Sequence, residues 1–209
     1  MIDVRFNGCG YILDDVPKNI FEIIKKESSR AKRKAISFST GLAGNIEEEY
    51  SINFENQSEY DEFEGYLLSL ITEFDNRFNY IQNIKILNKN LPYRLNAIWA
   101  NYQKKYEFNP YHDHYGLFSF VIWVKVPYLI EDEISIPSVR NSNLKAAGNF
   151  SFIYPSLYRI ENHNIPADKT YEGKIILFPS NLGHLVYPFY TSDDYRISVS
   201  GNINLIVPD

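Results

Sequence analysis

The chain has 209 residues, of which 44% are hydrophobic and 22% are charged, as in an ordinary globular protein. Its 17 tyrosines and 14 phenylalanines favour extensive β-structure, because aromatic side chains are enriched in strands. A net charge of −5 provides no general electrostatic attraction to nucleic acid or to anionic membranes. Length and composition predict a single β-rich domain spanning residues 1–209.

The cysteine content and the N-terminal sequence bear on the cellular compartment. Cys9 is the only cysteine, so one chain can form neither an internal disulfide framework nor a thiolate metal cluster. The N-terminus lacks a basic region followed by an apolar stretch, and no apolar run approaches the length of a membrane span. These features predict a cytoplasmic protein that does not insert into membranes.

In chain order, the first elements expected are a strand and a helix. A strand is expected around Val4 to Leu13, and Asp15 is the expected N-cap of a helix that begins near Pro17. The basic run from Arg30 to Lys34 suits the solvated end of this helix. The apolar residues at helical spacing are Ile20, Phe21, Ile23 and Ile24.

A polar segment and a second helix follow. The segment from Ser37 to Ile52 is rich in turn residues, and its run Glu47 to Glu49 is interpreted as a solvated face with no chemical role. A helix is predicted between Ser58 and Phe78, followed by a turn from Asn88 to Pro92. The residues that form the apolar stripe of this helix are Phe63, Tyr66, Leu67, Leu70, Ile71 and Phe74.

The rest of the chain is predicted to form strands, which cover Tyr93 to Gln103, Gly116 to Val126, Asn149 to Tyr154, Lys174 to Phe178, His184 to Pro188 and Tyr195 to Val207. The strand Leu117 to Val126 is apolar on both faces, so it should be buried on both sides. Helical support from residues 1–90 is therefore expected to cover one sheet of an antiparallel sandwich or barrel formed by residues 91–209.

Two histidines separated by one residue are the first candidate metal ligands. In an extended strand, side chains two residues apart point to the same face, so His112 and His114 can present two imidazoles while Asp113 points away. Two ligands hold a metal weakly, and His184, in the sequence KIILFPSNLGHLVYPF, is the candidate third ligand. His163 lies in the polar stretch ENHNIPADK and is expected in a surface loop.

Arg196 is the candidate anion-binding residue. Strand alternation places it on the same face as Ser198, Ser200 and Asn202. A buried guanidinium is costly without a carboxylate, which would be either a bound ligand or a neighbouring Asp193 or Asp194. Ser198 is positioned to add a hydroxyl to a bound carboxylate.

The combination of these motifs resembles the iron(II)/2-oxoglutarate-dependent dioxygenase superfamily, particularly an HxH subgroup found in phages and marine bacteria. The similarity covers roughly the whole chain. It is carried by HDH within WANYQKKYEFNPYHDHYGLFSFVIWVKVPY, by the distal histidine in LFPSNLGH, by YRIS followed by SGNI, and by LAGNIEEEY.

The resemblance implies a double-stranded β-helix, or jelly roll, whose helices pack on one sheet. It implies Fe(II) as the metal, with 2-oxoglutarate and O2 as cosubstrates. By matching positions, His112 and His184 would bind iron, and Arg196 and Ser198 would bind 2-oxoglutarate. His114 stands where most of the family has Asp or Glu; the site would then have three histidines, or Asp113 would supply the carboxylate through a bulge.

The resemblance also implies hydroxylation of a peptide side chain or a small molecule, with release of succinate and CO2. A peptide or small molecule ranks above nucleic acid because the chain is acidic. The alternatives are a non-catalytic metal-binding jelly roll that serves in phage or host interactions, and a cupin-like three-histidine enzyme that uses O2 alone.

Four further parts of the chain have weaker expected roles. Asn101 and Tyr102 precede the histidine pair, and packing is the favoured role for both, with 2-oxoglutarate binding as the alternative. For Trp123, filling of the core is the favoured role, with lining of the pocket as the alternative. The region Ile130 to Gly148 is either a lid over the substrate or an ordinary exposed connection.

Overall fold

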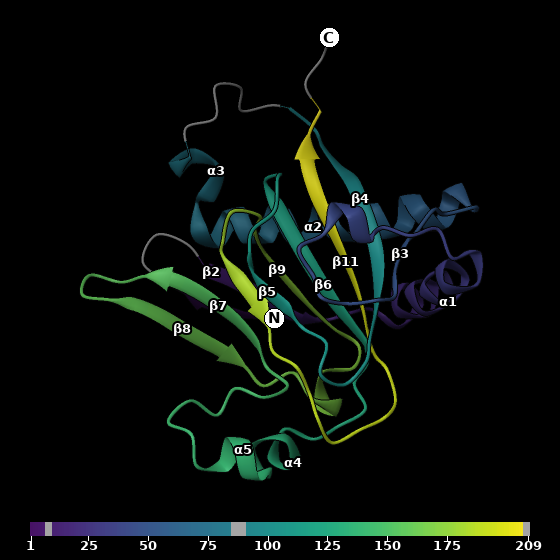
Figure 1. Cartoon of the computed structure of the whole chain (residues 1–209). Helices are drawn as coiled ribbons and strands as arrows, with labels where there is room; N and C mark the ends of the chain where they lie inside the picture. Colours follow the sequence, from purple (N-terminus) through teal and green to yellow (C-terminus); the bar gives the residue numbers. More distant parts are fainter. Residues whose placement is uncertain (7–9, 85–90, 207–209) are drawn as a thin grey trace.

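Two antiparallel sheets form the framework of the protein in a computed structural model that describes residues 1–6, 10–84 and 91–206 (Figure 1). The large sheet has the strand order β1-β2-β9-β6-β11-β4-β3, and the small sheet has the order β5-β10-β7-β8. The strands of the large sheet are β1 (Ile2–Arg5), β2 (Gly10–Asp15), β3 (Glu49–Ser51), β4 (Tyr93–Gln103), β6 (Phe118–Lys125), β9 (Lys174–Pro179) and β11 (Arg196–Leu205). Those of the small sheet are β5 (Asn109–His112), β7 (Phe150–Pro155), β8 (Ile160–Ile165) and β10 (His184–Val186).

The helices lie mainly on the outer face of the large sheet (Figure 1). They are α1 (Lys18–Lys34), α2 (Gln57–Phe78), α3 (Tyr80–Asn83), α4 (Ile130–Ser135) and α5 (Pro137–Arg140), with short 3-10 turns η1 (Ser39–Gly41) and η2 (Lys169–Tyr171). The apolar stripe of α2 packs on this face, as its spacing predicts; the fully or nearly fully buried members are Phe63, Leu67, Leu70, Ile71 and Phe74. None of the helices in the described residues is long and apolar enough to span a membrane.

A second core fills the space between the two sheets. Strand β6 contributes to both cores, because Phe118, Phe120 and Ile122 face the helices while Val121 and Trp123 face the small sheet. The prediction that this strand is buried on both sides is therefore confirmed. Large aromatic residues dominate the inner core, including Phe150, Phe152 and Phe178. The architecture is the expected double-stranded β-helix with helices on one sheet.

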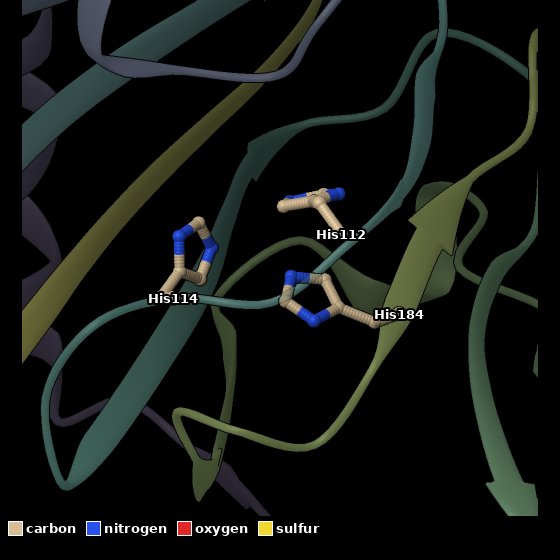
Figure 2. Close-up of side chains that lie close together, drawn as sticks. All are labelled: His112, His114 and His184. Carbon is tan, nitrogen blue, oxygen red and sulfur yellow. The ribbon is translucent and has the colours of Figure 1, made fainter.

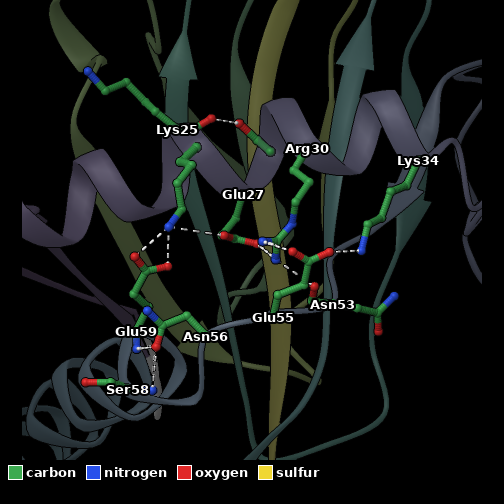
Figure 3. A network of polar contacts seen from close by, with 11 residues as sticks. Lys25, Glu27, Arg30, Lys34, Asn53, Glu55, Asn56, Ser58 and Glu59 are labelled. Carbon is green, nitrogen blue, oxygen red and sulfur yellow. Dashed lines mark hydrogen bonds and ion pairs between the residues drawn. The ribbon is translucent and has the colours of Figure 1, made fainter.

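Polar contacts fix α1 against the segment that leads into α2 (Figure 3). Arg30 of α1 forms ion pairs with Glu27 and, at 3.2 Å, with Glu55, and it donates a hydrogen bond to the backbone oxygen of Asn53. Lys34 also pairs with Glu55. The basic end of α1 is thus tied to neighbouring carboxylates rather than only solvated.

Several expectations about individual elements are wrong. The segment expected as one strand contains two antiparallel strands, β1 and β2, in which Val4 pairs with Tyr11. Asp15 does not cap α1; it ends β2 and forms an ion pair with Lys174 at 2.6 Å. His163 lies in strand β8 and not in a loop.

Parts of three expectations lie outside the described residues. These are the position of Cys9, residues 88–90 of the predicted turn, and Val207 at the end of the last predicted strand.

Candidate metal centre

Three histidines meet between the two sheets. His112 ends β5, His114 follows it by two residues, and His184 begins β10. Strands β5 and β10 are antiparallel, and their register places His184 directly opposite His112. Figure 2 shows the three imidazole rings directed toward one another, and one ligand nitrogen from each ring lies within 4.8 Å of the others.

Backbone carbonyls orient two of the rings. The Nδ1 atom of His112 lies 2.7 Å from the oxygen of Pro110, and that of His184 lies 2.9 Å from the oxygen of Leu182. A carbonyl oxygen only accepts hydrogen bonds, so each Nδ1 carries the proton and each Nε2 is left with a free lone pair. This arrangement is the usual support for a histidine that binds a metal through Nε2.

The histidines are held in the neutral form that metal binding requires. Burial lowers the pKa of His184 well below its ordinary value, and the neighbouring imidazoles lower it further. Burial lowers the pKa of His114 to about 4 and also lowers the pKa of His112. A metal ion about 2.1 Å from each nitrogen requires nitrogens about 3–4 Å apart, so small side-chain rotations would let this donor set hold one ion.

Asp113 does not join this group of ligand atoms. Its side chain is exposed, whereas the set of metal-ligand atoms found among the described residues comes from His112, His114 and His184. The alternation expected for an extended chain is therefore present, even though β5 ends at His112. The donor set of this structure consists of three neutral imidazoles.

A pocket extends from the histidines between the sheets toward Arg196. Strand β4 contributes Trp99, Asn101 and Gln103, strand β6 contributes Trp123, and β11 contributes Arg196, Ser198 and Ser200. Asn101 therefore faces the pocket, whereas Tyr102 points to the helices and donates a hydrogen bond to the oxygen of Ser28. Trp123 lines the pocket and also packs in the inner core.

Arg196 is only 3% exposed and lacks an ionic partner among the described residues. Its guanidinium donates to Gln103 Oε1, to Tyr128 Oη at 2.6 Å, and to the backbone oxygens of Gly148 (2.9 Å) and Tyr187 (3.0 Å). Asp193 and Asp194 pair instead with Lys105 and Lys125. Neutral oxygens thus orient a buried positive charge at one end of the pocket.

The region from Ile130 to Gly148 contains α4 and α5 and is anchored to the protein. Glu133 is fully buried and accepts hydrogen bonds from the backbone nitrogens of Tyr190 (2.7 Å) and Thr191 (2.9 Å). The segment ends at Gly148, whose oxygen contacts Arg196. It therefore helps to position Arg196 and is more than an exposed connection.

Sequence reasoning missed two groups of residues around the pocket. Gln103 and Tyr128 accept hydrogen bonds from Arg196, but neither residue belongs to a sequence motif. Strand alternation could have identified Gln103, because it shares a face of β4 with Trp99 and Asn101. Glu49 was assigned to a solvated run, yet it is 1% exposed. No local signal in the sequence indicates this, because the inward direction of Glu49 follows from the pairing of β3 with β4, which sets Glu49 opposite Asn101.

Comparison with known protein families identifies this type of site. Residues 97–202, half of the chain, match the model of a family described as "Putative 2OG-Fe(II) oxygenase". The chain therefore belongs to the 2-oxoglutarate- and Fe(II)-dependent oxygenases. Fe(II), 2-oxoglutarate and O2 are the cofactors of this family, and the His112, His114 and His184 group is chemically suited to the metal. No curated protein matches the sequence.

Two solved structures share the fold. A prolyl-4-hydroxylase from Pseudomonas putida has a TM-score of 0.57 at 13% identity, over 95% of this chain and 94% of that one. A viral collagen prolyl hydroxylase from Paramecium bursaria Chlorella virus-1, in complex with 2-oxoglutarate, has a TM-score of 0.53 at 14% identity, over 92% of this chain and 94% of that one. At these identities the likeness establishes the double-stranded β-helix alone.

Proposed function

We propose that this protein is an Fe(II)- and 2-oxoglutarate-dependent hydroxylase that acts on a peptide side chain or a small molecule. The observation that carries the proposal is a pocket lined both by three convergent, neutral histidines and by a buried arginine that has no carboxylate partner among the described residues. Such a pocket suits a metal ion and a dicarboxylate bound together. The family membership supports the same assignment.

In this proposal, His112, His114 and His184 hold the iron through one nitrogen each. Arg196 attracts the distal carboxylate of 2-oxoglutarate, and the neighbouring Ser198 hydroxyl is placed to donate to it. Gln103, Tyr128 and the oxygen of Gly148 keep the guanidinium in position before the cosubstrate arrives. Holding both partners in one orientation is the main contribution of the protein.

The iron with its cosubstrate supplies the oxidising chemistry, which converts 2-oxoglutarate and O2 to succinate and CO2 and hydroxylates a substrate C–H bond. The surrounding residues exclude water from this chemistry. Trp99, Phe150 and Phe178 surround the histidines, with ring centres 5.0 to 5.7 Å from a histidine ring. An apolar wall of this kind limits loss of reactive species to solvent.

His114 gives the site one negative charge fewer than a site with two histidines and one carboxylate. A carboxylate attracts Fe(II) electrostatically, whereas a neutral imidazole contributes only its lone pair. We therefore expect His114→Asp to bind Fe(II) at least as tightly as the natural protein does. His184→Ala should lower Fe(II) affinity at least tenfold, because it removes a ligand from the most buried position.

The test is O2-dependent conversion of 2-oxoglutarate to succinate by Fe(II)-loaded protein, followed by mass spectrometry together with measurement of bound iron. The natural protein and His114→Asp should both bind iron and release succinate, while His184→Ala should lose both. An Fe(II)-loaded natural protein that never consumes 2-oxoglutarate would instead indicate a non-catalytic metal-binding module.

A further inference from the structure

Glu49 is a buried carboxylate on the pocket side of the large sheet. It begins the edge strand β3, and its register places it opposite Asn101 of β4. The next residue, Tyr50, packs against the core under the helices, so alternation directs Glu49 toward the space between the sheets. The side chain is 1% exposed. Its neighbour Glu47, by contrast, lies at the surface with a side chain that is 74% exposed.

Glu49 has no charged partner within the part of the chain that the structure describes. Both of its carboxylate oxygens are buried without a hydrogen-bond partner, and no lysine or arginine of the described ranges forms an ion pair with it. The adjacent Glu48, in contrast, pairs with Lys32 at 3.0 Å and Lys104 at 3.3 Å. A buried carboxylate without a partner is costly, and a bound ligand with N–H donors would supply the partners that it lacks.

Two asparagine oxygens beside Glu49 are also buried without a partner: Oδ1 of Asn101 and Oδ1 of Asn109. Asn101 uses its Nδ2 to donate to Ser198 Oγ at 3.2 Å, which turns its oxygen away from that serine. The buried atoms of this group that lack a partner are all acceptor oxygens. A cluster of acceptor oxygens that includes a carboxylate attracts a cation with several N–H donors and repels an anion.

Gly44 lies against two of these oxygens. A Cβ atom at this residue would lie 2.2 Å from Asn109 Oδ1 and 3.0 Å from Glu49 Oε1, so both oxygens gather around the place that a side chain would occupy. Gly44, Asn101 and Asn109 line the same pocket as His112 and His114. Two members of the acceptor group therefore line the pocket of the metal centre, and Glu49 lies against Gly44, which lines the same pocket.

The protonation behaviour of Glu49 agrees with a missing cation. Burial raises the pKa of Glu49 to about 7, the negative charge of Glu107 adds to this increase, and the Ser39 side chain opposes it. A positively charged group placed beside the carboxylate would reverse the shift, because an opposite charge favours the ionised form. Binding of such a group would thus return Glu49 to its ordinary charged state.

We infer that Glu49, Asn101 and Asn109 form a subsite that binds an ammonium or guanidinium group of the substrate beside the metal centre. The substrate class is then a basic amine, either a lysine or arginine side chain of a peptide or a small amine-bearing molecule. This inference rests on the proposed hydroxylase function, because a bound amine is a substrate only if the protein is a hydroxylase. Asn101 pairs in register with Ser198 on one side and Glu49 on the other, so it separates the cosubstrate side of the pocket from the cationic side.

The experiment is calorimetric titration of anaerobic, Fe(II)- and 2-oxoglutarate-loaded protein with three probes: the Nα-acetyl amides of lysine, arginine and norleucine. The basic probes should bind at least tenfold more tightly than norleucine, which has a similar shape and no charge. Glu49→Gln should weaken binding of the basic probes at least tenfold, and the matched control Glu47→Gln, which removes an exposed charge from the same run, should change it less than twofold.

A second variant guards against loss of folding in Glu49→Gln. Gly44→Ala retains all charges but places a methyl group among the acceptor oxygens, and it should also weaken binding of the basic probes at least tenfold. Equal affinity for the basic and neutral probes would overturn the inference. So would unchanged binding in both variants, or displacement of the basic probes by calcium chloride at equal concentration, which would identify an inorganic cation site.

Failure of the inference and failure of the proposed function give different results. The same titration on metal-free protein should still detect the basic probes, because none of the three subsite residues is a proposed metal ligand. A protein that converts 2-oxoglutarate but binds charged and neutral probes equally would support the proposed function and contradict the cation subsite. A protein that binds the basic probes through Glu49 but does not bind iron would support the cation subsite and contradict the proposed hydroxylase function.

Discussion

Arg196 and Glu49 are buried ionisable groups, one basic and one acidic, that lack ionic partners among the described residues. They differ in how they are held. Neutral protein oxygens hold the guanidinium of Arg196 in one orientation, whereas the carboxylate oxygens of Glu49 have no hydrogen-bond partner. At the scale of single residues, the pocket is thus prepared for an anion at one position and for a cation at another.

Tyr128→Phe tests the orientation of Arg196. The Tyr128 hydroxyl accepts a hydrogen bond from Arg196 and donates one to the oxygen of Gly148 at 2.8 Å. Its removal should destabilise the protein by about 1–3 kcal/mol, because a buried donor loses a partner. The dissociation constant for 2-oxoglutarate, measured calorimetrically without O2, should rise several-fold while Fe(II) affinity stays unchanged.

Tyr102→Phe is the matched control for this change. It also removes a buried tyrosine hydroxyl from a hydrogen bond, but on the helix side of the large sheet, where the partner is the oxygen of Ser28. Its stability should fall similarly and its affinity for 2-oxoglutarate should not change. A loss of 2-oxoglutarate binding as large as that of Tyr128→Phe would contradict a specific role for Tyr128.

The buried carboxylate of Glu49 should make the stability of the protein depend on pH. Its pKa is about 7 in the folded protein and near 4.5 when the group is unperturbed, so the unfolded chain releases this proton first as pH rises. The contribution of Glu49 protonation to the free energy of unfolding is therefore complete below about pH 4.5 and is lost as the pH increases through 7. The test is urea unfolding of metal-free protein. The difference in free energy of unfolding between Glu49→Gln and the natural protein should shift in favour of the variant by about 2–3 kcal/mol from pH 5 to pH 8.

The comparison between the two proteins isolates Glu49 from the histidines, whose lowered pKa values act in the opposite direction. Glu47→Gln should follow the natural protein at both pH values, because Glu47 is exposed. Parallel pH profiles for the natural protein and Glu49→Gln would contradict this prediction, because they would show that folding does not raise the pKa of Glu49.

At the scale of elements, strand alternation and helical periodicity predicted much of the fold. Strand β4 spans the predicted residues, and the predicted inward face of β11 supplies Arg196, Ser198 and Ser200 to the pocket. Long apolar runs leave few alternatives for such strands. Strands β3, β5 and β8 are short and polar, so nothing in their local sequence distinguishes them from loops.

The Asn56 cap of α2 provides a test at this scale. The Asn56 side chain accepts hydrogen bonds from the backbone nitrogens of Ser58 at 2.9 Å and Glu59 at 3.4 Å. Asn56→Ala should reduce the free energy of unfolding by about 1 kcal/mol, which corresponds to roughly 2–4 °C in Tm for a chain of this size. Fe(II) affinity should not change, because α2 packs on the sheet face opposite the metal centre.

Asn53→Ala is the control for this cap. Asn53 lies in the same connection, and its side chain donates a hydrogen bond to the Ser51 hydroxyl at 3.3 Å. Differential scanning calorimetry should find its Tm within about 1 °C of that of the natural protein, consistent with an ordinary surface substitution. Equal losses in Asn53→Ala and Asn56→Ala would mean that the cap contributes no specific stability to α2.

At the scale of the whole molecule, the two sheets create the site by bringing together distant segments. The sequence analysis named His112, His114, His184 and Arg196 from motifs, and the fold places all four around one pocket. The neighbours that complete the pocket depend on the pairing of strands far apart in sequence, as with Glu49 opposite Asn101. A run of three glutamates indicates a solvated segment until this pairing is known, which is why Glu49 was misassigned.

The most direct test of the whole arrangement is anaerobic titration of Fe(II)-loaded protein with 2-oxoglutarate, followed through the visible metal-to-ligand charge-transfer band. The natural protein should develop a saturable band, and Arg196→Ala should require at least tenfold more 2-oxoglutarate while binding Fe(II) normally. A protein that holds iron but develops no band, or an Arg196→Ala variant with unchanged affinity for 2-oxoglutarate, would contradict the assignment of this pocket to iron and 2-oxoglutarate together.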